Sequence, residues 1–188
     1  HHGFADHLQR LAELPGLRGI RRILHTVPDD ISRSDRFVEN IQRLASYRLP
    51  FDLCLRSDQL PLGMQLVDQC PDVQFVLDHC GNPRVAEEEV EPWQGYITDF
   101  ARRPNVVAKV SGILANADAD WTVQSLRPYV EHIIQSFGWD RVVWGSDHPV
   151  CTLTANLTRW VGATREIIAG ASEDEQACLL HRNAERIY

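Results

Sequence analysis

The stretch "RVVWGSDHPV", residues 141–150, carries an acid and a histidine directly after an apolar run. Val142 to Trp144 are typical of a buried strand, and Asp147 and His148 follow where that strand ends. An Asp in this position commonly caps the next loop or helix. In a cleft, the same carboxylate can serve as a general base or a metal ligand. The motif alone leaves these two interpretations about even.

A second histidine follows another apolar run, in "VQFVLDHCGNP". Alternation along a strand groups His79 with Leu77 and Phe75, and we expect Asp78 to point to the opposite side. A lone histidine at a strand end is more often packed or hydrogen-bonded than functional. If both strands belong to one parallel sheet, however, His79 and Asp147 converge on the same edge, which favours a functional site.

Two cationic residues lie within other predicted strands. In "GLRGIRRILH", alternation places Arg21 on the side of His25, and an inward Arg suits a substrate carboxylate or a polarised carbonyl oxygen. The common alternative is a solvated or ion-paired surface arginine. In "VVAKVSG", Lys109 shares a face with Ser111, and a lysine amid apolar residues requires a carboxylate or a ligand to receive it. Ser146 is discounted as a nucleophile because G-x-S-x-G is absent.

The elements that must position these residues alternate between two periodicities. Short β-rich runs are predicted as strands over residues 19–24, 51–56, 73–79, 106–112 and 142–147. Helical spacing of apolar residues predicts helices over 36–47, 92–103, 126–137 and 157–170, followed by a last helix opened by the capping box Ser172 to Glu175. Gly138 is expected to cap the third of these helices.

Strand, helix, strand at these intervals predicts right-handed βαβ units and a mainly parallel sheet. No glycine-rich nucleotide-binding turn is present, and the chemical signals lie at the ends of several strands, as in a (β/α)8 barrel. Such a barrel has about 250 residues and about 31 per unit, so five units form an incomplete barrel. We expect residues 1–188 to be a single domain.

Composition excludes several classes of protein. The 188 residues include 19 Lys and Arg against 26 Asp and Glu, a net charge of −7 that disfavours nucleic acid as a partner. No apolar run is long enough to span a membrane, and no signal peptide is recognisable. Five scattered cysteines without C-x-x-C favour a reduced, cytoplasmic protein. A homo-oligomer is compatible with these features.

Four segments in the same order, "GLRGIRRILH", "FVLDHCGNP", "VVAKVSGI" and "GWDRVVWGSDHPV", followed by "NAERIY", resemble the amidohydrolase-related family. The resemblance is to its lactonase branch, which includes 2-pyrone-4,6-dicarboxylate lactonase and the L-fucono- and L-rhamnono-lactonases. It implies a distorted TIM-like (β/α)8 barrel, of which about five units are present here. His79 matches the family's mid-barrel histidine and Asp147 the aspartate after the last strand.

The resemblance implies hydrolysis of a lactone ring, with Asp147 as the base that activates water and His79 polarising the carbonyl. The residues that would hold a small-molecule lactone or carboxylate substrate are Arg21, His25, Lys109 and His148. A catalytic zinc site has three protein ligands, and only two, His79 and Asp147, remain in this chain. We therefore expect no metal bound to this chain and no required cofactor. A divalent ion such as zinc is compatible with the full-length protein.

The family's strand-one "H-x-H" is absent, so we expect the first βα units to be missing from these residues. His1 and His2 follow no apolar strand and are not taken as ligands. Two alternatives stay open. One is a metal-dependent decarboxylase on the same scaffold, which a carbon dioxide product would distinguish. The other is a non-catalytic barrel fragment, in which apolar strand edges would be exposed.

Overall fold

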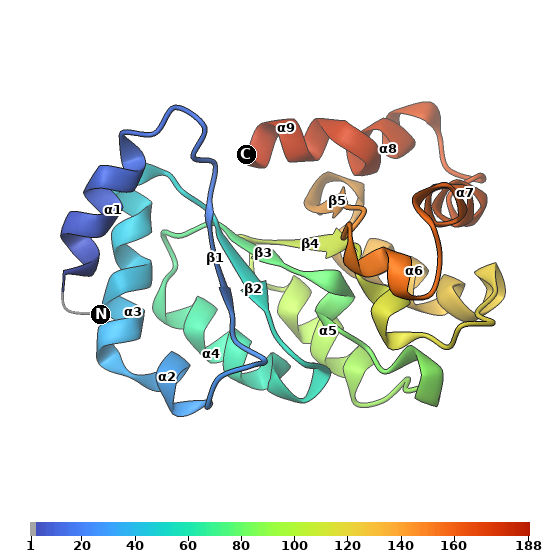
Figure 1. Cartoon of the computed structure of the whole chain (residues 1–188), viewed down its shortest axis with the longest axis horizontal. Coiled ribbons are helices and arrows are strands. Elements are labelled where there is room, and N and C mark those ends of the chain that lie inside the picture. Colours follow the sequence, from blue (N-terminus) through green and yellow to red (C-terminus); the bar gives the residue numbers. More distant parts are fainter. Residues whose placement is uncertain (1–2) are drawn as a thin grey trace.

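The computed structural model describes residues 3–188 and contains a five-stranded parallel sheet in the order β1-β2-β3-β4-β5 (Figure 1). The strands are β1 Ile20–Ile23, β2 Phe51–Cys54, β3 Phe75–Leu77, β4 Val106–Val110 and β5 Val142–Trp144. The predicted α/β class, with five consecutive βα units, is confirmed. His1 and His2, to which we assign no ligand role, lie outside the described residues.

Helices connect the strands and cover the sheet. They are α1 Phe4–Ala12, α2 Asp30–Arg33, α3 Asp35–Gln42, α4 Leu60–Gln69, α5 Trp93–Ala101, α6 Val123–Phe137, α7 Leu157–Ile167, α8 Glu173–Ala177 and α9 Asn183–Ile187. In Figure 1, α4 and α5 lie on one side of the sheet, and α8 and α9 lie on the other. Within residues 3–188, no helix is both long and apolar enough to cross a membrane.

The two faces of the sheet are packed differently. The outer face, which carries residues such as Phe51, Phe75 and Val106, joins the large core beneath the helices. The inner face has a small separate cluster, in which Val76, Val107 and Val143 pack against Ala184, Ile187 and Tyr188. The end of the chain therefore covers the inner face, the side that faces the interior in a barrel.

Both outer strands have one partner among the described residues: β1 pairs with β2, and β5 pairs with β4. The sheet is thus an arc of barrel wall. Ile23 lies on β1, at one end of this arc, and is 41% exposed. Such a free strand edge is the feature that a further strand of a barrel covers.

All five strands end earlier than predicted, and for two of them the last predicted residue has a different conformation. We predicted strands over 73–79 and 142–147, but β3 ends at Leu77 and β5 at Trp144. His79 and Asp147 have φ angles of 58° and 52°, in the left-handed region. The chain turns sharply at both residues, so simple alternation does not extend to them.

Helix α4 was not predicted. Its sequence, "LPLGMQLVDQ", is apolar on most sides, and without a polar face it lacks the pattern that marks a surface helix. The helix packs closely on the sheet at Gly63, where an added Cβ would lie 2.4 Å from a methyl carbon of Leu55. By contrast, the predicted cap at Gly138 and the capping box from Ser172 to Glu175 are confirmed.

Candidate active site

Four charged side chains form an ion-pair network on the inner face of the sheet. Its members are Arg21, Asp52, Asp78 and Lys109. Lys109 Nζ lies 2.7 Å from an oxygen of Asp52 and 2.9 Å from an oxygen of Asp78. Arg21 Nε lies 3.4 Å from the other oxygen of Asp78. We predicted that Lys109 needs a carboxylate or a ligand, and the structure shows two carboxylates beside it.

The position of Asp78 corrects our expectation. We predicted that it points away from the inner face, but its fully buried side chain lies on that face, two residues after Val76. The prediction was wrong because alternation was counted back from His79, which lies beyond the strand in a turn. Neither carboxylate oxygen accepts a hydrogen bond within residues 3–188, so its charge is compensated by Lys109 and Arg21.

His79 connects two strand ends at the mouth of the sheet. Its Nδ1 lies 2.9 Å from Ser111 Oγ, and its Nε2 lies 3.8 Å from Asp147 Oδ1. Burial lowers the pKa of His79 to about 4, against the attraction of Asp147, and the nearby Arg21 and Lys109 lower it further. The imidazole is therefore neutral at pH 7. Because a carboxylate oxygen accepts, we assign the imidazole proton to Nε2, which faces Asp147, and Ser111 then donates to Nδ1.

Ser111 holds the imidazole but has no access to a substrate. The residue is 1% exposed, and its hydroxyl lies on the side of the ring opposite Asp147. The three residues therefore do not form a nucleophilic triad, in which the serine must face the reacting carbonyl. Gly112, with φ 66°, leaves room for the ring, because an added Cβ would lie 2.4 Å from His79 Cγ.

Asp147 is fixed by the turn that follows β5. Its carbonyl accepts a hydrogen bond from Cys151 N at 3.0 Å, and Gly145 O accepts one from the indole of Trp160 at 3.1 Å. Trp144 stacks on Trp160 of α7, with ring centroids 6.2 Å apart, so its side chain faces the helices. The Asp147 carboxylate stays on the inner side and is directed toward His79.

Arg21 and His25 meet at Cys54, on the neighbouring strand. Arg21 Nη2 lies 3.8 Å and His25 Nδ1 lies 3.4 Å from the Cys54 sulfur. Partial burial lowers the pKa of His25, and the cations Arg56 and Arg21 add to this effect. The predicted grouping of Arg21 with His25 therefore matches the structure, and both lie beside the ion-pair network.

His148 does not join this group. It is exposed, and within residues 3–188 its side chain makes no hydrogen bond or ion pair; only its backbone N–H donates, to Ser146 Oγ at 3.2 Å. The turn at Asp147 directs the next residue outward. Its predicted role in substrate binding has no support from this geometry.

A cavity of about 360 Å³ opens at the same end of the sheet. Its lining residues are His25, Arg56, Ser57, Asp58, Asn82, Arg84 and Asn116. Both of its arginines are already paired: Arg56 lies 2.9 Å from Asp58, and Arg84 lies 3.1 Å from Glu89. The cavity therefore offers amide and hydroxyl groups rather than unpaired positive charge.

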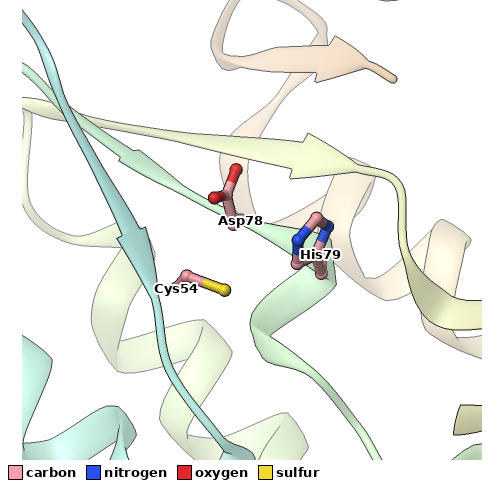
Figure 2. Close-up of side chains that lie close together, drawn as sticks. All are labelled: Cys54, Asp78 and His79. Carbon is pink, nitrogen blue, oxygen red and sulfur yellow. The ribbon is translucent and has the colours of Figure 1, made fainter. Parts of the chain in front are cut away.

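One group of three potential metal ligands lies close together in the described part of the chain. Figure 2 shows Cys54 on β2 and Asp78 and His79 after β3, and their ligand atoms lie within 4.8 Å of one another. Two observations oppose a metal ion here. Burial, reinforced by the charge of Asp78, raises the pKa of the Cys54 thiol to about 11. Lys109 and Arg21 already pair with the Asp78 carboxylate. The three residues do not fit a divalent cation.

Sequence reasoning missed three residues of this site: Asp52, Asp78 and Tyr188. Asp52 had a usable signal, since a carboxylate within "FDLC" is as unusual as Lys109 within "VVAKV". Asp78 was considered, but its side was wrongly assigned. Tyr188, whose hydroxyl lies 2.8 Å from Asp52, had no signal because nothing in the local pattern shows where the chain end packs.

The parallel βα arc, with polar side chains at the C-terminal ends of its strands, is part of a (β/α)-barrel fold. A family model described as Amidohydrolase matches residues 2–188, and the chain belongs to this family. The resemblance found in the sequence is thereby confirmed.

Three comparisons are informative. The chain is 32% identical over 192 residues to the protein y4mH of Sinorhizobium fredii, covering 97% of this chain and 64% of that protein. It is 32% identical over 148 residues to an L-fucono-1,5-lactonase of Burkholderia ambifaria, covering 78% of this chain and 51% of that lactonase. It superposes with a TM-score of 0.92 on a crystal structure of an amidohydrolase from Burkholderia multivorans with bound zinc, at 26% sequence identity. The superposition covers 97% of this chain and 69% of that structure's chain. The chain spans less than two thirds of the length of the first two relatives.

Proposed function

We propose that this chain carries the catalytic base of a hydrolase that opens the ring of a sugar lactone. The observation that carries the proposal is the pair formed by His79 and Asp147, with Nε2 3.8 Å from Oδ1 at the mouth of the sheet. A neutral imidazole N–H and a carboxylate side by side supply the hydrogen-bond donor and the base that lactone hydrolysis needs.

In the proposed reaction, Asp147 takes a proton from water while the water oxygen attacks the lactone carbonyl. The carbonyl oxygen gains negative charge, which the Nε2–H of His79 stabilises as a hydrogen-bond donor. The bond between the carbonyl carbon and the ring oxygen then breaks, and Asp147 returns its proton to the departing oxygen. The product is the open hydroxy acid, and Asp147 is restored as a carboxylate.

The charge of the mouth favours a neutral, hydroxylated substrate over a dicarboxylate. Arg56 and Arg84 have carboxylate partners, whereas Asn82 and Asn116 line the cavity with amide groups suited to hydroxyls. The match to an L-fucono-1,5-lactonase supports the same class of substrate. Arg21, whose side chain is 44% exposed, is the cation best placed to contact the substrate.

The other two predicted substrate ligands take narrower roles in this proposal. His25, which borders the cavity, contacts a substrate hydroxyl. Lys109 contributes charge rather than contact, because its ammonium already lies against two carboxylates. The proposed reaction places no metal on Cys54, Asp78 and His79, because these three residues do not fit one. The chelator in the test below asks whether a divalent ion bound elsewhere in the full-length protein takes part.

The test uses the full-length gene product, a panel of sugar 1,4- and 1,5-lactones, and 2-pyrone-4,6-dicarboxylate, with acid release followed with and without a chelator. We expect turnover of a sugar lactone that survives chelation and falls about 10²- to 10⁴-fold in Asp147→Asn. Asparagine tolerates the left-handed backbone of this position, so the turn is retained. Asp140→Asn, at an exposed aspartate near the start of β5, is the matched control. A folded wild type inactive on every lactone would refute the proposal.

A further inference from the structure

Tyr188 joins the ion-pair network from the far end of the sequence. Its hydroxyl donates to the two carboxylate oxygens of Asp52, at 2.8 and 2.9 Å, across 136 residues of chain. Its ring lies 5.4 Å from Lys109 Nζ, within reach of a cation–π interaction. Tyr188 therefore contacts both an acid and the central cation of the network, yet the proposed reaction does not use it.

The helix that carries Tyr188 is firmly attached to the sheet. Asn183 Nδ2 donates to the carbonyls of Trp139 and Val142, both at 2.7 Å. Ile187 and Ala184 pack on the apolar cluster of the inner face. These contacts fix where the Tyr188 hydroxyl lies.

We propose that Tyr188 is a positioning residue for Arg21, acting through the ion-pair network. The two carboxylates of this network share one ammonium group, that of Lys109. Among the described residues, Asp52 has two side-chain partners, Lys109 and the Tyr188 hydroxyl. The Tyr188 hydroxyl donates a hydrogen bond to the Asp52 carboxylate, so that Lys109 can pair with Asp78 as well as with Asp52.

Removal of the Tyr188 hydroxyl changes first the position of the Lys109 ammonium and then the position of the Arg21 guanidinium. Asp52 keeps Lys109 as its remaining partner and draws the ammonium toward itself. Asp78, which is fully buried and accepts no hydrogen bond in the described chain, then depends on Arg21. The guanidinium moves toward Asp78 and away from the mouth. In this way, Tyr188 determines how far Arg21 extends toward a bound substrate, a role that rests on the proposed function.

The first experiment observes Lys109 directly. Lys109 is the single lysine among the 188 residues, and a Lys109→Arg sample identifies its side-chain signal after ¹⁵N-lysine labelling. We expect Tyr188→Phe, which keeps the ring, to shift this ammonium signal. Tyr47→Phe, which removes a hydroxyl from an exposed tyrosine, should leave it unchanged. An unchanged signal in Tyr188→Phe would overturn the inference.

The second experiment tests the route to Arg21 with a double-mutant cycle. Tyr188→Phe should raise KM for the lactone about fivefold, the effect of losing one hydrogen bond, and leave kcat within about twofold. In an Arg21→Gln background it should have no further effect on KM. Equal fold-changes in both backgrounds would refute the route through Arg21. A purely structural role would lower the melting temperature without this selective change in KM.

Two safeguards keep the outcomes separate. If Tyr188→Phe does not fold, Asp52→Asn tests the same link, because it removes the charge that competes for Lys109 and should also shift the ammonium signal. An unshifted signal in a folded Asp52→Asn protein would count against the inference. If the wild type hydrolyses no lactone, the proposed function fails, while the ammonium signal still shows whether Tyr188 positions the network.

Discussion

His79 and Ser111 face each other across the ends of β3 and β4, with Nδ1 2.9 Å from Oγ. The serine is buried and lies on the opposite side of the ring from Asp147. Ser111 therefore fixes the orientation of the imidazole, while the Asp147 carboxylate favours the proton on Nε2. A hydrogen-bond donor to a substrate carbonyl requires both properties.

Replacement of Ser111 by alanine should lower kcat about 10²-fold, because the ring loses its fixed orientation toward the substrate. Lactone turnover and thermal unfolding are the measurements. Ser136→Ala provides the control, since Ser136 Oγ lies 3.4 Å from His132 Nε2 on α6, away from the site. If both variants lose the same activity, the effect is not specific to His79.

Stability should fall on acidification through the titration of His79. Burial, the largest influence, holds the pKa of His79 at about 4 in the folded chain, below the 6.5 of a free histidine. Between these values the unfolded chain binds more protons, so this contribution is complete above pH 6.5 and is lost as the pH falls toward 4. It amounts to roughly 3 kcal/mol, at about 1.4 kcal/mol per pKa unit.

Urea unfolding of wild type and His79→Gln at pH 7.5 and 4.5 measures this contribution. The pH dependence should be smaller in His79→Gln, and it should persist in His181→Gln, where the histidine is exposed. An equal pH dependence in wild type and His79→Gln would show that other groups cause the loss of stability.

Replacement of Gly112 by alanine should abolish turnover by displacing His79, whose Cγ would lie 2.4 Å from the new Cβ. Gly138→Ala is a matched control for backbone strain, because Gly138 has φ 74° but no atom within 4 Å of an added Cβ. Both variants should lose about 1–3 kcal/mol of stability, and Gly112→Ala alone should lose activity. Full activity in Gly112→Ala would contradict this.

Replacement of Lys109 by methionine leaves the carboxylates of Asp52 and Asp78 without their shared cation. The expected loss is about 3–5 kcal/mol in the free energy of unfolding, the usual effect of breaking a buried ion pair. Addition of Asp52→Asn should recover part of this loss, since it removes one of the two negative charges that Lys109 compensates. Denaturant unfolding of the single and double variants tests both statements.

The meeting of His79 and Asp147 could be predicted from the sequence because both follow apolar runs, and parallel strands end at one edge of a sheet. Alternation within β1 also predicted that the Arg21 side chain lies on the inner face of the sheet. The face on which Asp78 lies could not be predicted in this way, because it was counted from His79, where a left-handed turn breaks the alternation. The role of Tyr188 depends on how α9 packs on the inner face, which local periodicity does not encode.

The hydrogen bond between Tyr188 and Asp52 has a consequence for folding. It spans 136 residues, whereas β1 to β5 pair with strands that are adjacent in the chain. Closing a longer loop costs more entropy, so the strand pairs can form before the C-terminal helix docks. Before α9 docks, Asp52 lacks the hydrogen bond from Tyr188, and Asp52 and Asp78 both depend on Lys109. During synthesis, which proceeds from the N-terminus, the five strands can pair before the final charge arrangement of the mouth forms, and this arrangement requires that α9 and Tyr188 have been made.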